Sequence, residues 1–257
     1  MTKRAAWLLL FGAVAVRAGS GEDGEAIMRA VIDQASARDE VVDVRMRLVD
    51  ANGKERLRTA TLYTKKKTGP EENMRLIRFA TPPDLAGSGI LSQEQPERRA
   101  EHWLYMPAYH ASRRIASVNA SDTWMGTDFA YDDILDPRIA DHLYVVRGEE
   151  KVGGVACTVL EATPRDPRDA PYAKRVYWID RAKSVTHRIE YYDRAGAPFK
   201  TLTNDDLVLV GGRYRWRRGE MVNSRKQHRT LLEFSNWRID QGVEDRFFTV
   251  RYLERGM

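Results

Sequence analysis

The sequence predicts a mainly β protein (α+β) whose strands form one antiparallel sheet that curls on itself. Helical spacing of apolar residues extends over only one long stretch, residues 22–38. From residue 41 onward, apolar and polar residues alternate in short runs joined by short turns, which is typical of an antiparallel meander. The 257 residues fit one large all-β domain or two small ones, and no internal repeat or linker divides them, which favours one domain.

Residues 1–18 have the layout of a secretory signal peptide. Lys3 and Arg4 precede an apolar run over residues 5–16, and small residues around Ala18 form a cleavage site. The run is too short for a stable membrane span, and the alternative is an uncleaved N-terminal helix. We therefore expect export, cleavage near Ala18 and a mature domain over residues 19–257. No cysteine lies directly after the cleavage site, so a lipid anchor is not expected.

Charge and cysteine content exclude two classes of function. The net charge is +5, but the signal segment carries three basic residues, and its removal leaves 39 basic against 37 acidic residues. This balance gives no reason to expect nucleic-acid binding. The single cysteine, Cys157, lies in a strand pattern and is expected to be a buried apolar residue, since disulfide, zinc and redox spacings are all absent.

Alternation predicts the strands in order. Asn52-Gly53 tolerates positive φ and predicts a tight hairpin turn, whereas Pro82-Pro83 lacks the ladder donor and interrupts the sheet. The expected strands of the first half are residues 41–48, 57–65, 74–79, 87–91 and 103–106. Those of the second half are residues 143–149, 152–162, 175–179, 187–192, 200–210, 214–222, 226–239 and 247–253.

Residues 103–135 form the segment around which the sheet is expected to be organised. The aromatic strand 103–106 is followed, beyond a basic pair, by an apolar turn and a short acidic helix over residues 127–135. Thr127 or Asp128 can cap that helix by accepting a backbone N–H. A helix this short is unstable alone in water, so it must pack against the sheet.

The acidic residues of this segment form the cluster that could support catalysis: Asp122, Asp128, Asp132, Asp133 and Asp136. Paired carboxylates could serve acid–base hydrolysis, and His110 or His142 could join them as metal ligands. The histidines occur singly, however, and no phosphate loop, nucleophile elbow or dinucleotide fingerprint is present. We therefore expect no enzyme, no cofactor and no metal, with the acids acting as helix caps and solvated charges.

Two interpretations of the sheet interior remain open on periodicity alone. Large apolar side chains alternate along the strands, but alternation does not say which face points inward. The interior could be an ordinary packed core. It could also be an underfilled half-open barrel, with the helix at residues 22–38 and the helix at 127–135 as lids over a cavity.

The central segment carries a family resemblance. Its motifs WLYMPAYHASRRI (103–115) and WMGTDFAYDDI (124–134), with FATPPDLAGSGIL (79–91) upstream, resemble the periplasmic outer membrane lipoprotein-sorting family, the LolA-like proteins. The resemblance extends from about residue 40 to the C-terminus. It implies a half-open antiparallel β-barrel of about 10–12 strands with an N-terminal helix and short lid helices over a hydrophobic cavity.

The resemblance also suggests site residues. The cavity is expected to be lined by Phe79, Leu91, Trp103, Tyr105, Met106, Trp124, Met125, Phe129, Ile134 and Leu135. A lid latch is expected between the basic pair Arg113-Arg114 and the acids Asp128 and Asp132, because a guanidinium can bind a carboxylate through two hydrogen bonds.

The implied function is that of a periplasmic carrier. It would bind the acyl chains of a lipid or acylated protein and shuttle this cargo from an inner-membrane exporter, of the RND/MMPL or ABC type, to the outer membrane, with transient membrane contact and no nucleic-acid partner. Each buried methylene contributes about 0.8 kcal/mol, so a modest cavity can hold an acyl chain outside a membrane. The alternative is a non-enzymatic adaptor of such an exporter that holds no lipid.

Overall fold

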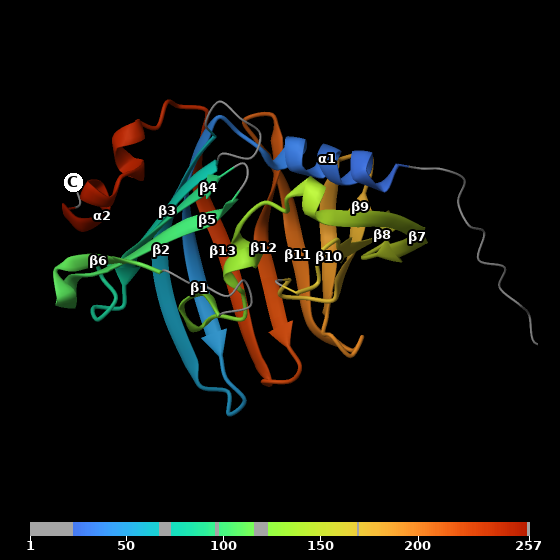
Figure 1. Cartoon of the computed structure of the whole chain (residues 1–257), viewed down its shortest axis with the longest axis horizontal. Coiled ribbons are helices and arrows are strands. Elements are labelled where there is room, and N and C mark those ends of the chain that lie inside the picture. The colour runs from blue at the N-terminus through green and yellow to red at the C-terminus, as the bar shows by residue number, and fades with distance from the viewer. Residues whose placement is uncertain (1–22, 67–72, 96–97, 116–122, 169, 256–257) are drawn as a thin grey trace, which may run out of the picture.

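The structure is a computed structural model that describes residues 23–66, 73–95, 98–115, 123–168 and 170–255. Within these residues, one open, thirteen-stranded antiparallel sheet dominates the fold (Figure 1). The mainly β, half-open architecture expected from the sequence is thus confirmed, with slightly more strands than the 10–12 implied by the resemblance. The signal segment at residues 1–18 and Asp122 lie outside the described residues. In the described part of the chain, no helix has the length and apolar character of a membrane span.

The strands are β1 Asp39–Val49, β2 Glu55–Lys66, β3 Asn73–Thr81, β4 Gly89–Gln95, β5 Arg98–Met106, β6 Ala111–Arg114, β7 His142–Val152, β8 Val155–Pro164, β9 Lys174–Asp180, β10 Val185–Tyr192, β11 Pro198–Val210, β12 Arg213–Asn223 and β13 His228–Ile239. Two α-helices, α1 Gly24–Ala35 and α2 Val250–Arg255, flank the sheet. Five 3₁₀ turns complete the described elements: η1 Pro107–Tyr109, η2 Trp124–Gly126, η3 Tyr131–Ile134, η4 Ile139–Asp141 and η5 Asp245–Phe248.

The sheet consists of two meanders joined through β1 and β13. Its order is β6-β5-β4-β3-β2-β1-β13-β12-β11-β10-β9-β8-β7, so the first meander ends at one edge and the second begins at the other. The chain must therefore travel from β6 to β7 across the whole sheet. Residues 123–141, here named the crossover segment, lie on one face of the sheet along this path (Figure 1).

This crossover replaces the single meander expected from the sequence. Strand order is set by the β1–β13 pairing, in which Val44 is opposite Phe234 and Met46 is opposite Leu232. These partners are almost two hundred residues apart, and short-range alternation carries no information about such a pairing. The Asn52-Gly53 turn, a local feature, is found where expected, between β1 and β2, with Gly53 at φ 76°.

Each strand has an inner face, which is covered by α1 and the crossover segment, and an outer face. Val44, Met46 and Leu48 of β1 lie in an inner-face cluster with Ile77 and Phe79 of β3. Near the β6 edge the outer face is also covered, because η5 and α2 pack there against β3, β4 and β5 (Figure 1). The result is a sheet end that is apolar on both sides.

The strand predicted for the C-terminal segment is wrong. Residues 247–253 show strand-like alternation, yet they form the end of η5 and most of α2. Phe248 and Leu253 are fully buried against the outer face, and the ring of Phe247 stacks on Tyr63 at 5.3 Å between centroids. Tertiary packing on an apolar surface thus outweighs the local pattern. The short strand β6, which contains Arg113 and Arg114, was not expected either.

Helix α1 confirms the one long helical pattern, with both ends shorter than residues 22–38. The Asp23 carboxylate caps it by accepting from the Glu25 N–H. Gly24 lies so close to the sheet that a Cβ there would be 3.0 Å from Leu160 Cδ1 and from the Tyr144 carbonyl oxygen. A glycine at this position therefore lets the helix approach the inner face.

The crossover segment contains 3₁₀ turns in place of the expected helix over residues 127–135. At η3 the N-cap is Ala130, whose N–H donates to the Asp133 carboxylate at 2.8 Å. The expected caps, Thr127 and Asp128, have other partners: the Thr127 hydroxyl donates to the Trp124 carbonyl, and Asp128 contacts β13. An acidic first turn is found, but its carboxylates mainly form ion pairs with residues of the sheet.

Candidate functional site

An apolar cavity of about 270 Å³ lies between the inner face and the crossover segment. The crossover segment contributes Trp124, Phe129 and Ile134 to its lining. The sheet contributes the other apolar lining residues: Val44, Met46, Leu62, Ile77, Ile90, Leu202, Leu232 and Phe234. The remaining lining residues are Arg75, Ser92, Asp133, Asn204 and Gly219. The volume is just below the usual range of ligand pockets, about 300–1,000 Å³, so the cavity is shaped for a small apolar group.

The residues suggested by the sequence fall at different distances from this cavity. Trp124, Phe129 and Ile134 line it, as stated above. Phe79 and Met125 lie in the adjoining cluster, where the ring of Phe79 is 6.3 Å from that of Trp124. Met106 and Leu135 are half-buried and are not among its lining residues.

Three of the suggested residues point to the outer face of the sheet, away from the cavity. Leu91, Trp103 and Tyr105 pack on the outer face with Phe248 and Leu253. Successive side chains of a strand alternate between faces, so the inner-face residues of these strands are Ile90 and its neighbours in register. Assigning these three to the cavity is therefore wrong. The outer face at this end of the sheet is buried under α2, and its aromatic residues resemble interior ones in sequence.

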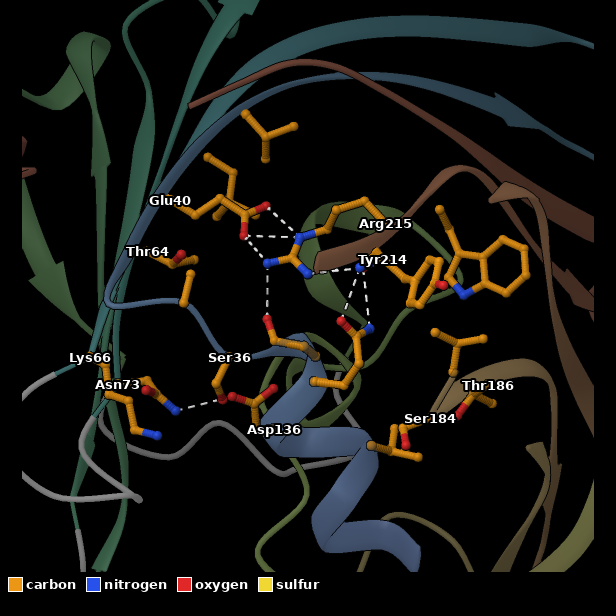
Figure 2. A pocket seen from close by; sticks show the side chains of 18 of the residues that line it. Ser36, Glu40, Thr64, Lys66, Asn73, Asp136, Ser184, Thr186, Tyr214 and Arg215 are labelled. Carbon is orange, nitrogen blue, oxygen red and sulfur yellow. Dashed lines mark hydrogen bonds and ion pairs between the residues drawn. The ribbon is translucent and has the colours of Figure 1, made fainter. Parts of the chain in front are cut away.

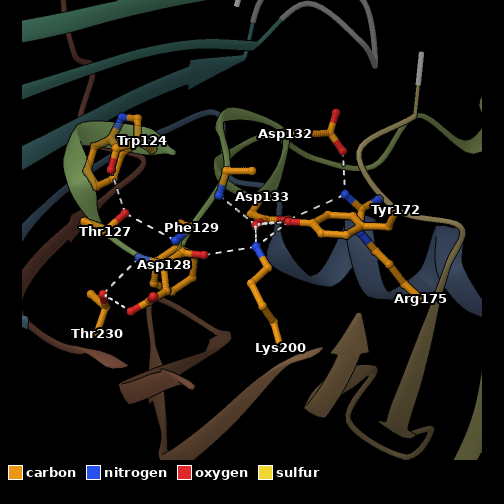
Figure 3. Close-up of polar contacts among 11 residues, drawn as sticks. Trp124, Thr127, Asp128, Phe129, Asp132, Asp133, Tyr172, Arg175, Lys200 and Thr230 are labelled. Atoms are coloured by element: carbon orange, nitrogen blue, oxygen red, sulfur yellow. Dashed lines mark hydrogen bonds and ion pairs between the residues drawn. The ribbon is translucent and has the colours of Figure 1, made fainter. Parts of the chain in front are cut away.

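Asp128 fixes the first part of the crossover segment to β13. Its carboxylate accepts from the Thr230 hydroxyl at 2.8 Å, while its own N–H donates to Thr230 Oγ1 at 3.0 Å (Figure 3). The same carboxylate is 2.6 Å from His228 Nδ1. Asp128 is 3% exposed and Thr230 is fully buried. A buried carboxylate held by two hydrogen bonds, with a third from its own backbone N–H, is a fixed attachment, since each bond to the charged carboxylate contributes about 1.5–3 kcal/mol.

A second attachment joins the crossover segment to β9 and β11. Lys200 Nζ is 3.0 Å from the Asp133 carboxylate and also donates to the Tyr172 hydroxyl, which itself donates to Asp133 at 2.6 Å (Figure 3). The Arg175 guanidinium is 2.5 Å from the carboxylate of Asp132 and 3.5 Å from Asp133. Burial lowers the pKa of Lys200, and the adjacent Asp133 charge opposes that shift. We name Asp132, Asp133, Tyr172, Arg175 and Lys200 the buried ionic cluster.

A third attachment holds the end of the segment against β3. The Arg75 guanidinium is 2.8 Å from the Asp136 carboxylate and 2.5 Å from Glu94, and the Asn73 amide donates to both acids. On β2, the Arg58 guanidinium donates to the Met125 carbonyl at 2.6 Å. The four described acids of the cluster noted in the sequence, Asp128, Asp132, Asp133 and Asp136, therefore all contact partners on the sheet, and the expectation of mainly solvated charges was wrong.

The latch between the basic pair and the acids is also wrong. Arg114 forms an ion pair with Glu101 of the neighbouring strand β5, and Arg113 lies over the Tyr109 ring, 5.6 Å from its centroid. Both arginines are exposed on the edge strand β6, whereas Asp128 is buried against β13. The carboxylates are instead bound by His228, by Arg175 and by the other partners described above.

His102 is a buried histidine behind the cavity wall, and it gives a pH prediction. Its Nδ1 is 2.8 Å from the hydroxyl of Ser92, a cavity-lining residue, and its ring is 5.2 Å from that of Tyr131. Burial lowers the pKa of His102 from 6.5 to about 4. Between these pH values the unfolded chain binds more protons than the folded protein, so stability falls as the pH drops from 6.5 to 4.

We expect this group to account for about 3 kcal/mol of unfolding free energy lost over that window. Urea unfolding of the wild type and of His102→Gln, at pH 7 and pH 4, measures it. The glutamine can still bond Ser92 but does not titrate, so the variant should lose less stability on acidification. Equal losses in both proteins would show that His102 does not titrate in this way.

The sheet-side partners of the acids could have been found in the sequence by one signal. Arg175 and Lys200 each lie near the start of a strand, and the residues two positions further on, Tyr177 and Leu202, pack in the inner-face clusters. A charged residue on the same strand face as buried apolar residues needs a buried partner, because an unpaired buried charge is costly. Among the described residues, no three His, Cys, Asp or Glu side chains are grouped as a metal site.

Comparisons with solved structures agree with this geometry. A domain from Vibrio parahaemolyticus, described as that of an outer membrane lipoprotein-sorting protein, superposes with a TM-score of 0.84 and 29% identity, over 90% of this chain and 98% of that one. A DUF1329 family protein from Desulfovibrio piger gives 0.82 and 24%, over 91% and 100%. A LolA superfamily protein from Nitrosomonas europaea gives 0.72 and 20%, over 90% and 100%. No curated protein matches the sequence.

The open sheet, the helix across its inner face and the cavity beneath the crossover segment define a protein of the LolA-like class, which confirms the resemblance seen in the sequence. Residues 71–255, well over half of the chain, match the model of a family described as "-like: Uncharacterized protein". The chain belongs to that family.

Proposed function

We propose that the protein is a periplasmic carrier that binds an acyl chain of a lipid or lipoprotein in the cavity beneath the crossover segment. The observation that carries this proposal is the cavity itself, whose lining is apolar on both the sheet side and the crossover side. Natural cores contain few voids larger than a water molecule, so a space of about 270 Å³ is more than imperfect packing. Burial of apolar surface there would stabilise a bound chain at about 25 cal/mol per Å².

Non-covalent transfer fits the other features of the site. The LolA-like fold supports a carrier that takes cargo from an inner-membrane exporter and delivers it towards the outer membrane. No bond-making step is required, because binding and release of an apolar chain suffice. Contact with each membrane would be transient.

Organic extraction of the purified protein followed by mass spectrometry tests the proposal. We expect a co-purifying lipid or lipoprotein in wild-type protein isolated without detergent. A wild type that carries no lipid and does not bind a hydrophobic fluorophore would favour the adaptor alternative, in which the same inner face binds an exporter's periplasmic domain.

Periplasmic location gives its own prediction. The charged start and the apolar run before Ala18 are the features of a cleaved signal peptide. N-terminal sequencing of protein recovered from the periplasmic fraction should therefore begin just after residue 18. Mature protein that retains Met1 would contradict both cleavage and the proposed mature domain, residues 19–257.

A further inference from the structure

A second cavity, of about 330 Å³ (Figure 2), adjoins the apolar one; we name it the polar cavity because its lining is more polar than that of the first. It lies where the C-terminal end of α1 meets the inner face. Leu62, Arg75 and Asn204 line both cavities, so the two spaces are neighbours separated by single side chains. The polar lining includes hydroxyl and amide side chains from distant parts of the chain: Gln34, Ser36, Thr64, Asn73, Ser184 and Thr186. An apolar compartment beside a polar one is the shape expected for an amphiphile.

The charges of the polar cavity are largely paired. Arg215 binds Glu40 through two nitrogens, with the closer contact at 2.6 Å, and also donates to the Ala35 carbonyl (Figure 2). Arg75 is bound between Glu94 and Asp136, as described above. These guanidinium groups are not available to a ligand without breaking ion pairs.

Lys66 is different. It follows Leu62 and Thr64 at alternate positions of β2, so its ammonium group is on the inner face. Lys65, its neighbour, points the other way and pairs with Asp245 at 2.6 Å. Within the described ranges, the Lys66 ammonium has no hydrogen-bond or ion-pair partner, although it lines the polar cavity. An ammonium group carries three donors and one charge, so it can bind one anionic group.

The volume of the apolar cavity limits the number of chains. A cavity of about 150 Å³ in another protein binds benzene, with its six carbons. In proportion, about 270 Å³ accommodates about eleven carbons, which is a single short acyl chain or part of a longer one. Two or three chains do not fit without rearrangement of the crossover segment.

We propose that the cargo is a single-chain amphiphile with one anionic head group, whose chain lies beneath Trp124 and whose head lies beside Lys66. This inference rests on the proposed carrier function and narrows its substrate class. The head group is a carboxylate or a phosphodiester, since either can accept from an ammonium. A multiply charged head would require separation of the Arg75 or Arg215 ion pairs.

Displacement of a bound hydrophobic fluorophore tests this inference with four compounds: laurate, lauroyl lysophosphatidylglycerol, neutral monolauroylglycerol and two-chain dilauroyl phosphatidylglycerol. In the wild type, at least one of the two single-chain anions should compete about tenfold better than the neutral and two-chain compounds. Whichever of the two binds better identifies the carboxylate or the phosphodiester as the head group. Lys66→Gln should remove this preference and leave binding of monolauroylglycerol unchanged.

Lys151→Gln is the matched control, because Lys151 is an exposed lysine of β7 that does not line either cavity. It should behave like the wild type. Equal competition by the neutral compound, or a Lys66→Gln variant that keeps the preference, would overturn the anionic head. Better competition by the two-chain lipid would overturn the single chain. In these cases the carrier function stands, whereas failure of every compound and of the fluorophore to bind would contradict the carrier function itself.

Discussion

Replacement of Asp133 by leucine is expected to lower the free energy of unfolding by about 3–5 kcal/mol. Asp133 is the shared carboxylate of the buried ionic cluster, 3.0 Å from Lys200 Nζ and 2.6 Å from the Tyr172 hydroxyl. Its side chain is 1% exposed and that of Lys200 is 5% exposed, so water cannot replace the lost partner. Removal of one member of a buried ion pair leaves the other charge uncompensated, which is the costly outcome.

Urea unfolding at pH 7 measures this effect through the midpoint, with the slope as a check on two-state behaviour. The double variant Asp133→Leu, Lys200→Met should lose much less than the sum of the two single variants, because an apolar pair replaces the ionic one. Strictly additive losses would mean that the two residues are not energetically coupled.

The matched control for this prediction is Asp205→Leu. Asp205 pairs with Arg218 at 2.7 Å, but its side chain is 70% exposed. An exposed ion pair contributes only about 0–1 kcal/mol, so the same substitution at Asp205 should barely change stability. A comparable loss at both positions would show that burial is not the source of the effect at Asp133.

Replacement of Leu232 by glutamate is expected to weaken binding of a hydrophobic fluorophore, and of co-purifying lipid, at least hundredfold. Leu232 lines the apolar cavity from β13, where a carboxylate would have to be desolvated beside an apolar ligand. Burial of such a group without a partner costs several kcal/mol, and about 2.7 kcal/mol corresponds to a hundredfold loss of affinity.

Leu231→Glu provides a control one residue away. Leu231 and Leu232 are consecutive in β13, so their side chains point to opposite faces, and both are half-buried. The Leu231 variant should bind like the wild type, and both variants must unfold cooperatively on heating. A folded Leu232→Glu protein with unchanged affinity would place the acyl-chain site elsewhere in the molecule.

Local features of the chain were predictable because they depend on neighbouring residues. The alternation that predicts β1 to β5 and β7 to β13 is the two-residue period of a strand, and the Asn52-Gly53 turn depends on the positive φ that a glycine tolerates, here at Gly53. The helical spacing before residue 38 likewise predicted α1. The boundaries of these elements differ from the predictions by a few residues, as fraying and capping would cause.

The site was less predictable, because each of its contacts joins distant parts of the sequence. Asp128 and Thr230 are 102 residues apart, and Asp133 and Lys200 are 67 apart. The sequence shows that acids and arginines are present, but pairing Arg114 with Asp128 assumed that nearness in the chain means nearness in space. The crossover from one sheet edge to the other separates these two residues and brings Asp128, Asp132 and Asp133 to the second meander.

By itself, the sequence determined the mainly β fold class, the LolA-like resemblance and the segment that covers the cavity, since composition, period and motif are properties of short stretches. The tertiary structure decided which strand faces point inward, that residues 247–253 form a helical cover, and which basic residues hold the crossover segment. The physical reason is the pairing of β1 with β13, a contact between strands almost two hundred residues apart in the sequence. That pairing fixes the strand order, and the strand order fixes every partner of the site.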